Sequence, residues 1–231
     1  MMTGQRIVAG ISLPIGDTHF ADHLRKGPLF AGKGTYQFAK IEAGIAVVDA
    51  GKRCVALDIG GHVGLWSRVL AHHFQRVVAF EPLPALIPHF KFNTADCENV
   101  KLIECAAGET DGEIDLVTVA DNSGNGYVAP TGVSGTSIFS APVVRVDSLN
   151  LHDVDFIKID VEGWEVPVIM GAQRTIRRDR PVMVVEQKPN NAERYGRTRM
   201  SAVDLLKTWG YDIAWERSGD YCLTWKGEPA A

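Results

Sequence analysis

Apolar residues follow two kinds of spacing along most of this chain. Short runs with few polar interruptions, at residues 55–58, 77–80 and 182–185, predict buried strands. Between them, apolar side chains recur at intervals of three and four residues over 65–74 and 84–95, which predicts amphipathic helices. This alternation predicts an α/β fold that has a mostly parallel sheet with helices on both faces.

The same criteria place the remaining elements. Further strands are expected at residues 100–106, 113–119, 143–146 and 156–161, and further helices at 34–48, 165–177 and 200–209. Apolar runs at 211–215 and 221–225 flank a Ser-Gly-Asp turn and predict a C-terminal antiparallel hairpin. With 231 residues and 45% hydrophobic content, residues 1–231 are expected to form one domain, of which 1–50 are an N-terminal segment.

The composition changes over residues 121–140, where glycine, serine and threonine are frequent. Such a stretch predicts a surface loop. Long loops in compact domains often carry function, so a lid over an active site is one interpretation and a tolerated insertion is the other.

Charge and cysteine content narrow the expected partners and compartment. The net charge of −4 gives no basic excess, so nucleic acid is not an expected partner. The four cysteines form no C-x-x-C pair and are expected to be buried thiols in a reducing compartment. Residues 1–16 lack the long apolar core of a signal peptide and no membrane span is visible, so we expect a cytoplasmic protein.

A glycine-rich turn after the strand at 55–58 is the most informative feature. Asp58 ends the apolar run, Gly60 and Gly64 belong to the turn that follows, and a helix begins directly after it. The next apolar run ends in Glu81. Strand, glycine turn, helix, strand and acid form a nucleotide-binding βαβ unit, in which the acid accepts hydrogen bonds from ribose hydroxyls.

The glycine spacing favours S-adenosylmethionine over a dinucleotide. The dinucleotide fingerprint is G-x-G-x-x-G, whereas His62 stands in place of the middle glycine. Asp58 adds a negative charge beside the turn, which is unfavourable for a diphosphate and tolerable for a cofactor with a sulfonium and an ammonium group. We expect His62 to contribute its backbone or to pack, with a general-base role as the alternative.

A second group of acids follows the strand at 156–161. Asp160 and Glu162 are two residues apart, so in extended backbone their side chains point the same way. Asp58, Glu81 and Asp160 all stand at carboxyl ends of predicted strands, where ligands of open α/β sheets bind. We interpret Asp160 and Glu162 as catalytic, because a carboxylate near the methyl group can take the proton of a hydroxyl acceptor. A cap at Asp160 and a solvated Glu162 are the alternative.

Other polar residues give weaker indications. The pair Asp160 and Glu162 could orient an acceptor through a divalent ion, but nothing in the sequence requires a metal and none is assigned. Glu186 follows the strand at 182–185 and either lines the acceptor pocket or caps its own loop. His19 and His23 have the spacing of a ligand pair on a helix but lack the expected acid between them, and are interpreted as non-functional.

Together these segments resemble the FkbM-type methyltransferases, a branch of the class I S-adenosylmethionine-dependent enzymes. The resemblance covers about residues 34–187 and rests on 57–64 (LDIGGHVG), 80–82 (FEP), 99–100, 106–108, 157–165 (IKIDVEGWE) and 184–186. It implies a Rossmann-like sheet of seven strands and transfer of a methyl group to oxygen. The expected partner is a small-molecule or glycan hydroxyl acceptor.

The resemblance also implies cofactor contacts. Asp58, Gly60 and Gly64 are expected to shape the methionine side of the pocket, Glu81 to hold the ribose, and the backbone near Ala106 to meet the adenine.

Three further positions bear on the cofactor. Tyr36 and Gln37 stand where such enzymes often carry an aromatic residue and an acid near the methionine carboxylate, and Gln37 departs from the acid. His62 departs from the asparagine that is common at its position.

Two other functions remain open. A Rossmann oxidoreductase that uses NAD(P) shares the strand, turn and helix layout, and residues 36–40 match the Y-x-x-x-K pattern of short-chain dehydrogenases, although before the glycine turn rather than after it. A non-catalytic module that binds S-adenosylmethionine is the second alternative. Methylation of nucleic-acid bases is disfavoured, because the N-P-P-Y or D-P-P-Y motif of amino-methyltransferases is absent.

Overall fold

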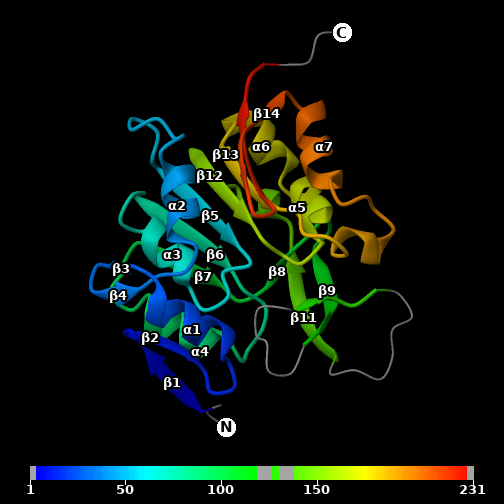
Figure 1. Cartoon of the computed structure of the whole chain (residues 1–231). Coiled ribbons are helices and arrows are strands. Elements are labelled where there is room, and N and C mark those ends of the chain that lie inside the picture. The colour runs from blue at the N-terminus through cyan, green and yellow to red at the C-terminus, as the bar shows by residue number, and fades with distance from the viewer. Residues whose placement is uncertain (1–3, 119–125, 131–137, 228–231) are drawn as a thin grey trace.

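A sheet of seven strands forms the centre of the computed structural model, which describes residues 4–118, 126–130 and 138–227 (Figure 1). The strand order is β14-β15-β13-β12-β5-β6-β7. The strands are β5 (Val55–Ile59), β6 (Arg76–Phe80), β7 (Val100–Ile103), β12 (Val154–Ile159), β13 (Val182–Glu186), β14 (Tyr211–Arg217) and β15 (Asp220–Trp225). β15 pairs antiparallel with β13 and β14, and the other pairs are parallel. The predicted α/β sheet and its C-terminal hairpin are confirmed.

The strand order creates a crevice between β5 and β12. From β5 the chain adds β6 and β7 on one side, and β12 starts the other half of the sheet. A reversal of this kind is a topological switch point, and ligands of open α/β sheets bind there beyond the carboxyl ends of the strands. The glycine turn follows β5 and the Asp160 segment follows β12, so both motifs of the sequence meet at this crevice.

Helices cover both faces of the sheet, as the sequence predicts. Leu57 and Ile159 point to the face covered by α5 (Glu165–Gly171), α6 (Gln173–Asp179) and α7 (Ser201–Thr208). In the same two strands, Ala56 and Phe156 point to the opposite face, which is covered by α2 (Phe38–Ile45) and α3 (Leu65–Leu70). The alternation follows from the two-residue period of a strand. Within the described ranges, none of the helices combines the length and the hydropathy that a bilayer span needs.

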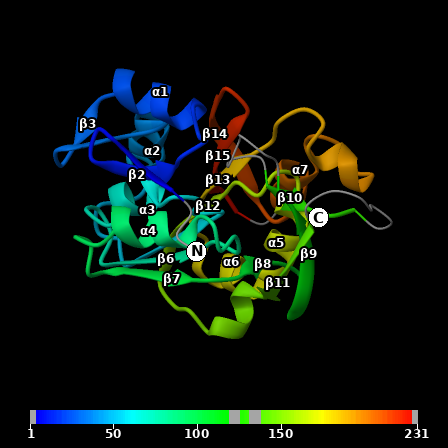
Figure 2. The same cartoon turned by 90° about the horizontal axis from the view of Figure 1, so that it is seen from below.

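Residues before α2 form elements that the sequence pattern does not predict. They are β1 (Gln5–Val8), β2 (Ile11–Pro14), α1 (His19–Lys26), β3 (Leu29–Phe30) and β4 (Lys33–Gly34). The hairpin of β1 and β2 packs against α4 (Ile87–Asn93), as both views of the molecule show (Figures 1 and 2). Buried polar groups connect them: Ser12 N donates to Asn93 Oδ1 at 2.7 Å, and Ser12 Oγ lies 2.7 Å from His89 Nδ1.

A second sheet, of four strands, replaces part of what the sequence predicts as strand and loop. Its order is β10-β9-β11-β8, with β8 (Ala106–Ala107), β9 (Gly112–Val117), β10 (Tyr127–Val128) and β11 (Ile138–Val144). The predicted strand at 100–106 is therefore wrong beyond Ile103, where the chain leaves the central sheet. Within the predicted loop 121–140, residues 127–128 and 138–140 are strand. Residues 121–125 and 131–137 lie outside the described residues, and with them most of the proposed lid.

Two further expectations are wrong in detail. The predicted helix at 165–177 is divided at Ala172 into α5 and α6. At Gly171 a side chain would lie 1.8 Å from the Gly108 carbonyl oxygen, so the backbones are in close contact there. Asp147 then accepts hydrogen bonds from the backbone N–H groups of Arg174 and Thr175 and caps α6. The predicted strand at 143–146 ends at Val144, before the 3-10 helix Val146–Leu149; a second 3-10 helix is Ala192–Tyr195.

Glu165, the first residue of α5, is a buried acid at a helix start. Its side chain is 2% exposed, and its Oε1 accepts a hydrogen bond from Gly163 N at 2.8 Å. Burial raises the pKa of Glu165 to about 7, against the lowering effect of the Gly163 N–H group. The folded protein therefore binds a proton at Glu165 more readily than the unfolded chain does. As the pH rises from 4.5, the ordinary pKa of a glutamate, to about 7, its pKa in the folded protein, Glu165 makes the folded state progressively less stable.

We expect Glu165→Gln to stabilise the protein at about pH 8 by roughly 1–3 kcal/mol, because glutamine keeps an acceptor for Gly163 N without burying a charge. Urea unfolding at about pH 5 and pH 8 measures this, and the gain should shrink at the lower pH. A difference that is equal at both pH values contradicts the prediction.

Candidate active site

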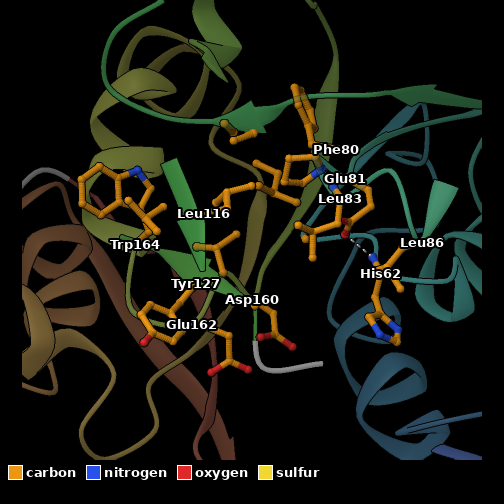
Figure 3. Close-up of a pocket in the computed structure, with 18 of the residues that line it drawn as sticks. His62, Phe80, Glu81, Leu83, Leu86, Leu116, Tyr127, Asp160, Glu162 and Trp164 are labelled. Carbon is orange, nitrogen blue, oxygen red and sulfur yellow. Dashed lines mark hydrogen bonds between the residues drawn. The ribbon is translucent and has the colours of Figure 1, made fainter. Parts of the chain in front are cut away.

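A pocket opens beyond the carboxyl ends of β5, β6 and β12 (Figure 3). Residues from both sequence motifs and from the second sheet share it. Among those that line it are Phe20, Gly60, His62, Glu81, Leu83, Leu86, Ala106, Leu116, Tyr127, Val128, Asp160, Glu162 and Trp164. The structure thus brings together six of the residues expected from the sequence: Gly60, His62, Glu81, Ala106, Asp160 and Glu162.

Gly60 and Gly64 of the turn each allow a close contact with a different part of the chain. Gly60 has φ +81°, and a Cβ there would lie 1.9 Å from the Asp160 carbonyl oxygen. Gly64 has φ +85°, and a Cβ there would lie 3.0 Å from Thr94 Cγ2 beside α4. Gly60 therefore allows β5 and β12 to meet at the pocket, whereas Gly64 allows the start of α3 to pack and does not line the pocket.

Glu81 is held in place by the backbone. His62 N donates to Glu81 Oε2 and Leu83 N donates to Oε1, each at 2.9 Å (Figure 3). Burial raises the pKa of Glu81 to about 7, and the two N–H groups oppose this only in part. The carboxylate is thus oriented toward the pocket before any ligand binds, and it changes its charge near neutral pH.

The walls beside Glu81 are largely apolar. Leu83 follows β6, Ala106 belongs to β8, and Leu116, Tyr127 and Val128 come from β9 and β10 of the second sheet. A flat heteroaromatic ring is the kind of group that such walls accommodate. The expected position of Ala106 at the pocket is found, while the contribution of β9 and β10 is not visible in the sequence pattern.

Asp160 and Glu162 line the same pocket on the side of Tyr127 (Figure 3). Burial raises the pKa of Asp160, but the ammonium groups of Lys158 and Lys188 lower it, so the pKa lies below its ordinary value. Burial and the neighbouring Asp160 raise the pKa of Glu162. Asn191 Nδ2 donates to Glu162 Oε2 at 2.8 Å and fixes that side chain.

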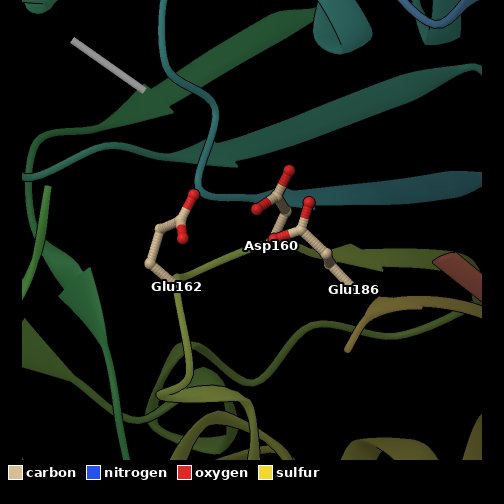
Figure 4. Close-up of side chains that lie close together, drawn as sticks. All are labelled: Asp160, Glu162 and Glu186. Atoms are coloured by element: carbon tan, nitrogen blue, oxygen red, sulfur yellow. The ribbon is translucent and has the colours of Figure 1, made fainter. Parts of the chain in front are cut away.

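Glu186 joins this pair from the end of β13 (Figure 4). One carboxylate oxygen of each of Asp160, Glu162 and Glu186 lies within 4.8 Å of the other two, so the three could supply ligands to a divalent cation. Burial and Asp160 raise the pKa of Glu186 to about 10, against the lowering effect of the Lys188 ammonium group. Lys188 forms an ion pair with Glu186, so a cationic side chain already occupies the cluster.

Asp58 lies beneath the pocket rather than at it. Its side chain is fully buried, Ser67 Oγ donates to Oδ2 at 2.6 Å, and Lys158 Nζ lies 3.2 Å from Oδ1. Both carboxylate oxygens of Asp58 therefore contact other side chains of the protein instead of facing the pocket. A direct cofactor contact of Asp58 stays a prediction from the resemblance.

Tyr36, Gln37 and His62 make contacts around Phe20 and α3. The ring of Tyr36 packs on Phe20, with the centroids 4.7 Å apart, and Gln37 Oε1 accepts a hydrogen bond from Trp66 Nε1 at 3.0 Å. Neither Tyr36 nor Gln37 lines the pocket. The His62 ring stacks on Phe20 with centroids 4.5 Å apart, and its backbone N–H binds Glu81, as expected for a backbone and packing role.

Sequence reasoning missed residues that complete the site. Phe20 lies in a segment without a clear period, and Tyr127 lies in the glycine-rich stretch, so neither carries a local signal. Lys158 did carry one: it is a lysine within an apolar strand, and a buried charge needs a partner.

Comparison with known proteins identifies the family. A family model for the FkbM methyltransferase domain matches residues 58–213. A search of curated proteins gives no match. A solved structure of methyltransferase FkbM from Methylobacillus flagellatus KT is similar with a TM-score of 0.51 and 19% identity; the match covers 74% of this chain and 43% of that one.

Other solved structures share the architecture. A putative rRNA methylase from Clostridium thermocellum is similar with a TM-score of 0.52 and 10% identity over 84% of this chain and 98% of that one. Precorrin 8w decarboxylase from Methanobacterium thermoautotrophicum gives a TM-score of 0.51 and 16% identity over 84% and 92%. At such identities the similarity shows the Rossmann-like fold alone.

The family decides between the two cofactors that the glycine turn left open. Its model spans both motifs, from Asp58 through the segment that contains Asp160 and Glu162, and it describes a methyltransferase rather than a nicotinamide-dependent enzyme. Because the match covers more than half of the chain, the protein belongs to the FkbM methyltransferase family, and S-adenosylmethionine is its cofactor.

Proposed function

We propose that this protein transfers a methyl group from S-adenosylmethionine to a hydroxyl oxygen of a small molecule or glycan. The observation that carries the proposal is the position of the Asp160 and Glu162 carboxylates in the same pocket as Glu81 and the glycine turn. A carboxylate at the place of transfer suits an acceptor that must lose a proton, as a hydroxyl does. The cysteines are free thiols, which fits a cytoplasmic enzyme.

The described residues fit the cofactor. Glu81 presents two carboxylate oxygens fixed by backbone donors, which suits the two ribose hydroxyls. The apolar wall from Leu83, Ala106 and Leu116 suits the adenine ring. On this placement, the methionine part lies toward Gly60 and Asp160.

The charges of the acids suggest their roles. Bound S-adenosylmethionine supplies an electrophilic methyl carbon on a sulfonium leaving group. Asp160 has a lowered pKa and is ionised, so it is the group that we expect to accept the hydroxyl proton as the acceptor oxygen bonds to the methyl carbon. Glu162, fixed by Asn191, would accept a hydrogen bond from the acceptor and hold its oxygen in line.

The acceptor side of the pocket has features that suit a polyol. Tyr127 lies beside Glu162 (Figure 3), and its ring is covered on one face by Arg194, whose guanidinium carbon is 3.8 Å from the ring centroid. An aromatic ring next to carboxylates can pack against the C–H groups of a sugar while the carboxylates bind its hydroxyls. The net charge of −4 does not favour nucleic acid as the acceptor.

We expect Asp160→Asn to reduce methyl transfer by about 100-fold or more, because the variant cannot accept the hydroxyl proton. Incorporation of labelled methyl groups into a panel of hydroxylated metabolites and glycans finds the acceptor and measures the loss. Calorimetry with S-adenosylhomocysteine checks that the cofactor site of the variant remains intact.

Glu104→Gln is a matched control, since it removes an exposed acid that pairs with Lys91 outside the pocket and should leave transfer unchanged. Full activity of Asp160→Asn contradicts the catalytic role. If the wild-type protein binds S-adenosylhomocysteine but transfers no methyl group to any member of the panel, the result favours a non-catalytic module.

Glu81 leads to a pH-dependent affinity. The ribose hydroxyls donate to the ionised carboxylate, and the pKa of Glu81 in the free protein is about 7. Affinity for S-adenosylhomocysteine should therefore be greatest above pH 7. Well below pH 7 the carboxylate must release a proton before it can bind the ribose, so the affinity should decrease by about tenfold for each pH unit. Calorimetry across this range measures the slope.

Glu81→Gln is the comparison for the pH profile. This variant should bind more weakly, by about 2 kcal/mol, and without the slope. A wild-type profile that is as flat as that of the variant is inconsistent with a titrating ribose ligand.

A further inference from the structure

Lys158 is an unusual residue for the centre of a parallel sheet. It is the residue before the last of β12, directly opposite Asp58 on β5, and only 4% of it is exposed. Strand positions of this kind normally carry apolar side chains. A buried ammonium group requires partners for its charge and for its three N–H donors.

The hydrogen bonds and the ion pair of Lys158 connect it to β5 and the turn that carry the first motif. Its Nζ donates to the Gly60 carbonyl oxygen at 2.6 Å and to that of Ile59 at 3.4 Å, and lies 3.2 Å from Asp58 Oδ1. The ammonium group thus has two carbonyl acceptors and one carboxylate as an ion-pair partner. Burial lowers the pKa of Lys158, but Asp58 and Asp160 raise it above its ordinary value, so the group keeps its charge.

The opposite side of the same turn is bound by β6. Gly60 N and Gly61 N both donate to the Phe80 carbonyl oxygen, at 3.1 and 2.9 Å, and His62 N donates to Glu81. The N–H groups of Gly60, Gly61 and His62 therefore bind to β6 and to Glu81 directly after it. On the other side, the Ile59 carbonyl accepts from Asp160 N at 3.1 Å, and the Gly60 carbonyl accepts from the side chain of Lys158. Lys158 is the side chain that holds the turn on the β12 side.

The pairing also assigns a role to Asp58. A lone ammonium group below the turn would repel a cofactor that carries a sulfonium, whereas the pair of Asp58 and Lys158 has no net charge. Ser67 Oγ satisfies the other Asp58 oxygen, so the carboxylate is fixed. Asp58 thus acts on the cofactor site through Lys158.

We propose that Lys158 is a positioning residue for S-adenosylmethionine: held by Asp58, it fixes the carbonyl group of Gly60 and thereby the turn that lines the cofactor pocket. The lysine of the second motif and the acid of the first then work as one unit. The proposal rests on the cofactor alone and does not depend on the nature of the acceptor.

The test uses the full chain with Asp58→Asn and Lys158→Met combined, because removing both charges leaves no unpaired buried ion. We expect the double variant to keep a cooperative thermal transition and to bind S-adenosylhomocysteine at least about tenfold more weakly in calorimetry. The control Thr175→Ala removes a buried hydrogen bond to Asp147 in α6, outside the pocket and the turn, and should lower the unfolding temperature while leaving affinity within about twofold.

A second double variant, Asp58→Asn with Lys158→Gln, restores one donor toward the carbonyl groups. It should bind S-adenosylhomocysteine with an affinity between those of wild type and the Met variant. If the Met variant does not fold, a loss of at least about threefold in the Gln variant supports the proposal. Wild-type affinity in either folded double variant overturns it.

Discussion

The close approach of β5 and β12 at their carboxyl ends is the constraint on which the site depends. Gly60 meets the Asp160 carbonyl so closely that no side chain could be placed between them. This contact brings the turn of the first motif against the acids of the second, although about a hundred residues separate them in the chain. The same contact leaves the carbonyls of the turn facing β12, where Lys158 can reach them.

Acids at neighbouring strand ends have different roles because their surroundings differ. Asp58 is neutralised by Lys158 and buried below the turn, whereas Glu81 accepts hydrogen bonds from two backbone N–H groups and lines the pocket. Asp160 and Glu186 stand close together, and the lowered pKa of Asp160 together with the raised pKa of Glu186 divides them into a stronger and a weaker acid. Counting acids along the sequence cannot reveal this division, which depends on the cations that the fold places beside each one.

Local pattern was sufficient for the central sheet and for both motifs. The strands at 55–58, 77–80 and 182–185 are continuous apolar runs, and burial on both faces requires that pattern. Elements that depend on distant partners were not predictable: β8 leaves the central sheet to pair with β11, and β2 is held by Asn93 of α4. The position of Asp58 in the first motif predicts a contact with the cofactor. The sequence does not show that Lys158 lies opposite Asp58, because that neighbourhood arises only when β5 and β12 pair. Six of the expected site residues do share the pocket, since strand ends of a parallel sheet converge whatever their side chains contact.

The position of β15 shows that the segment that matches the family is shorter than the segment that the fold needs. Residues 58–213 carry the family likeness, yet β15 (Asp220–Trp225) lies inside the sheet, between β13 and β14. Without β15, the exposed edge of β13 would lose its backbone partners, and β14 would have nothing to pair with. The start of the chain matters in the same way, because His89 and Asn93, which are within the family likeness, hold their buried hydrogen bonds to Ser12. A fragment cut at the limits of homology would therefore carry open strand edges and orphaned polar groups, so domain boundaries for expression have to follow the hydrogen bonds rather than the alignment.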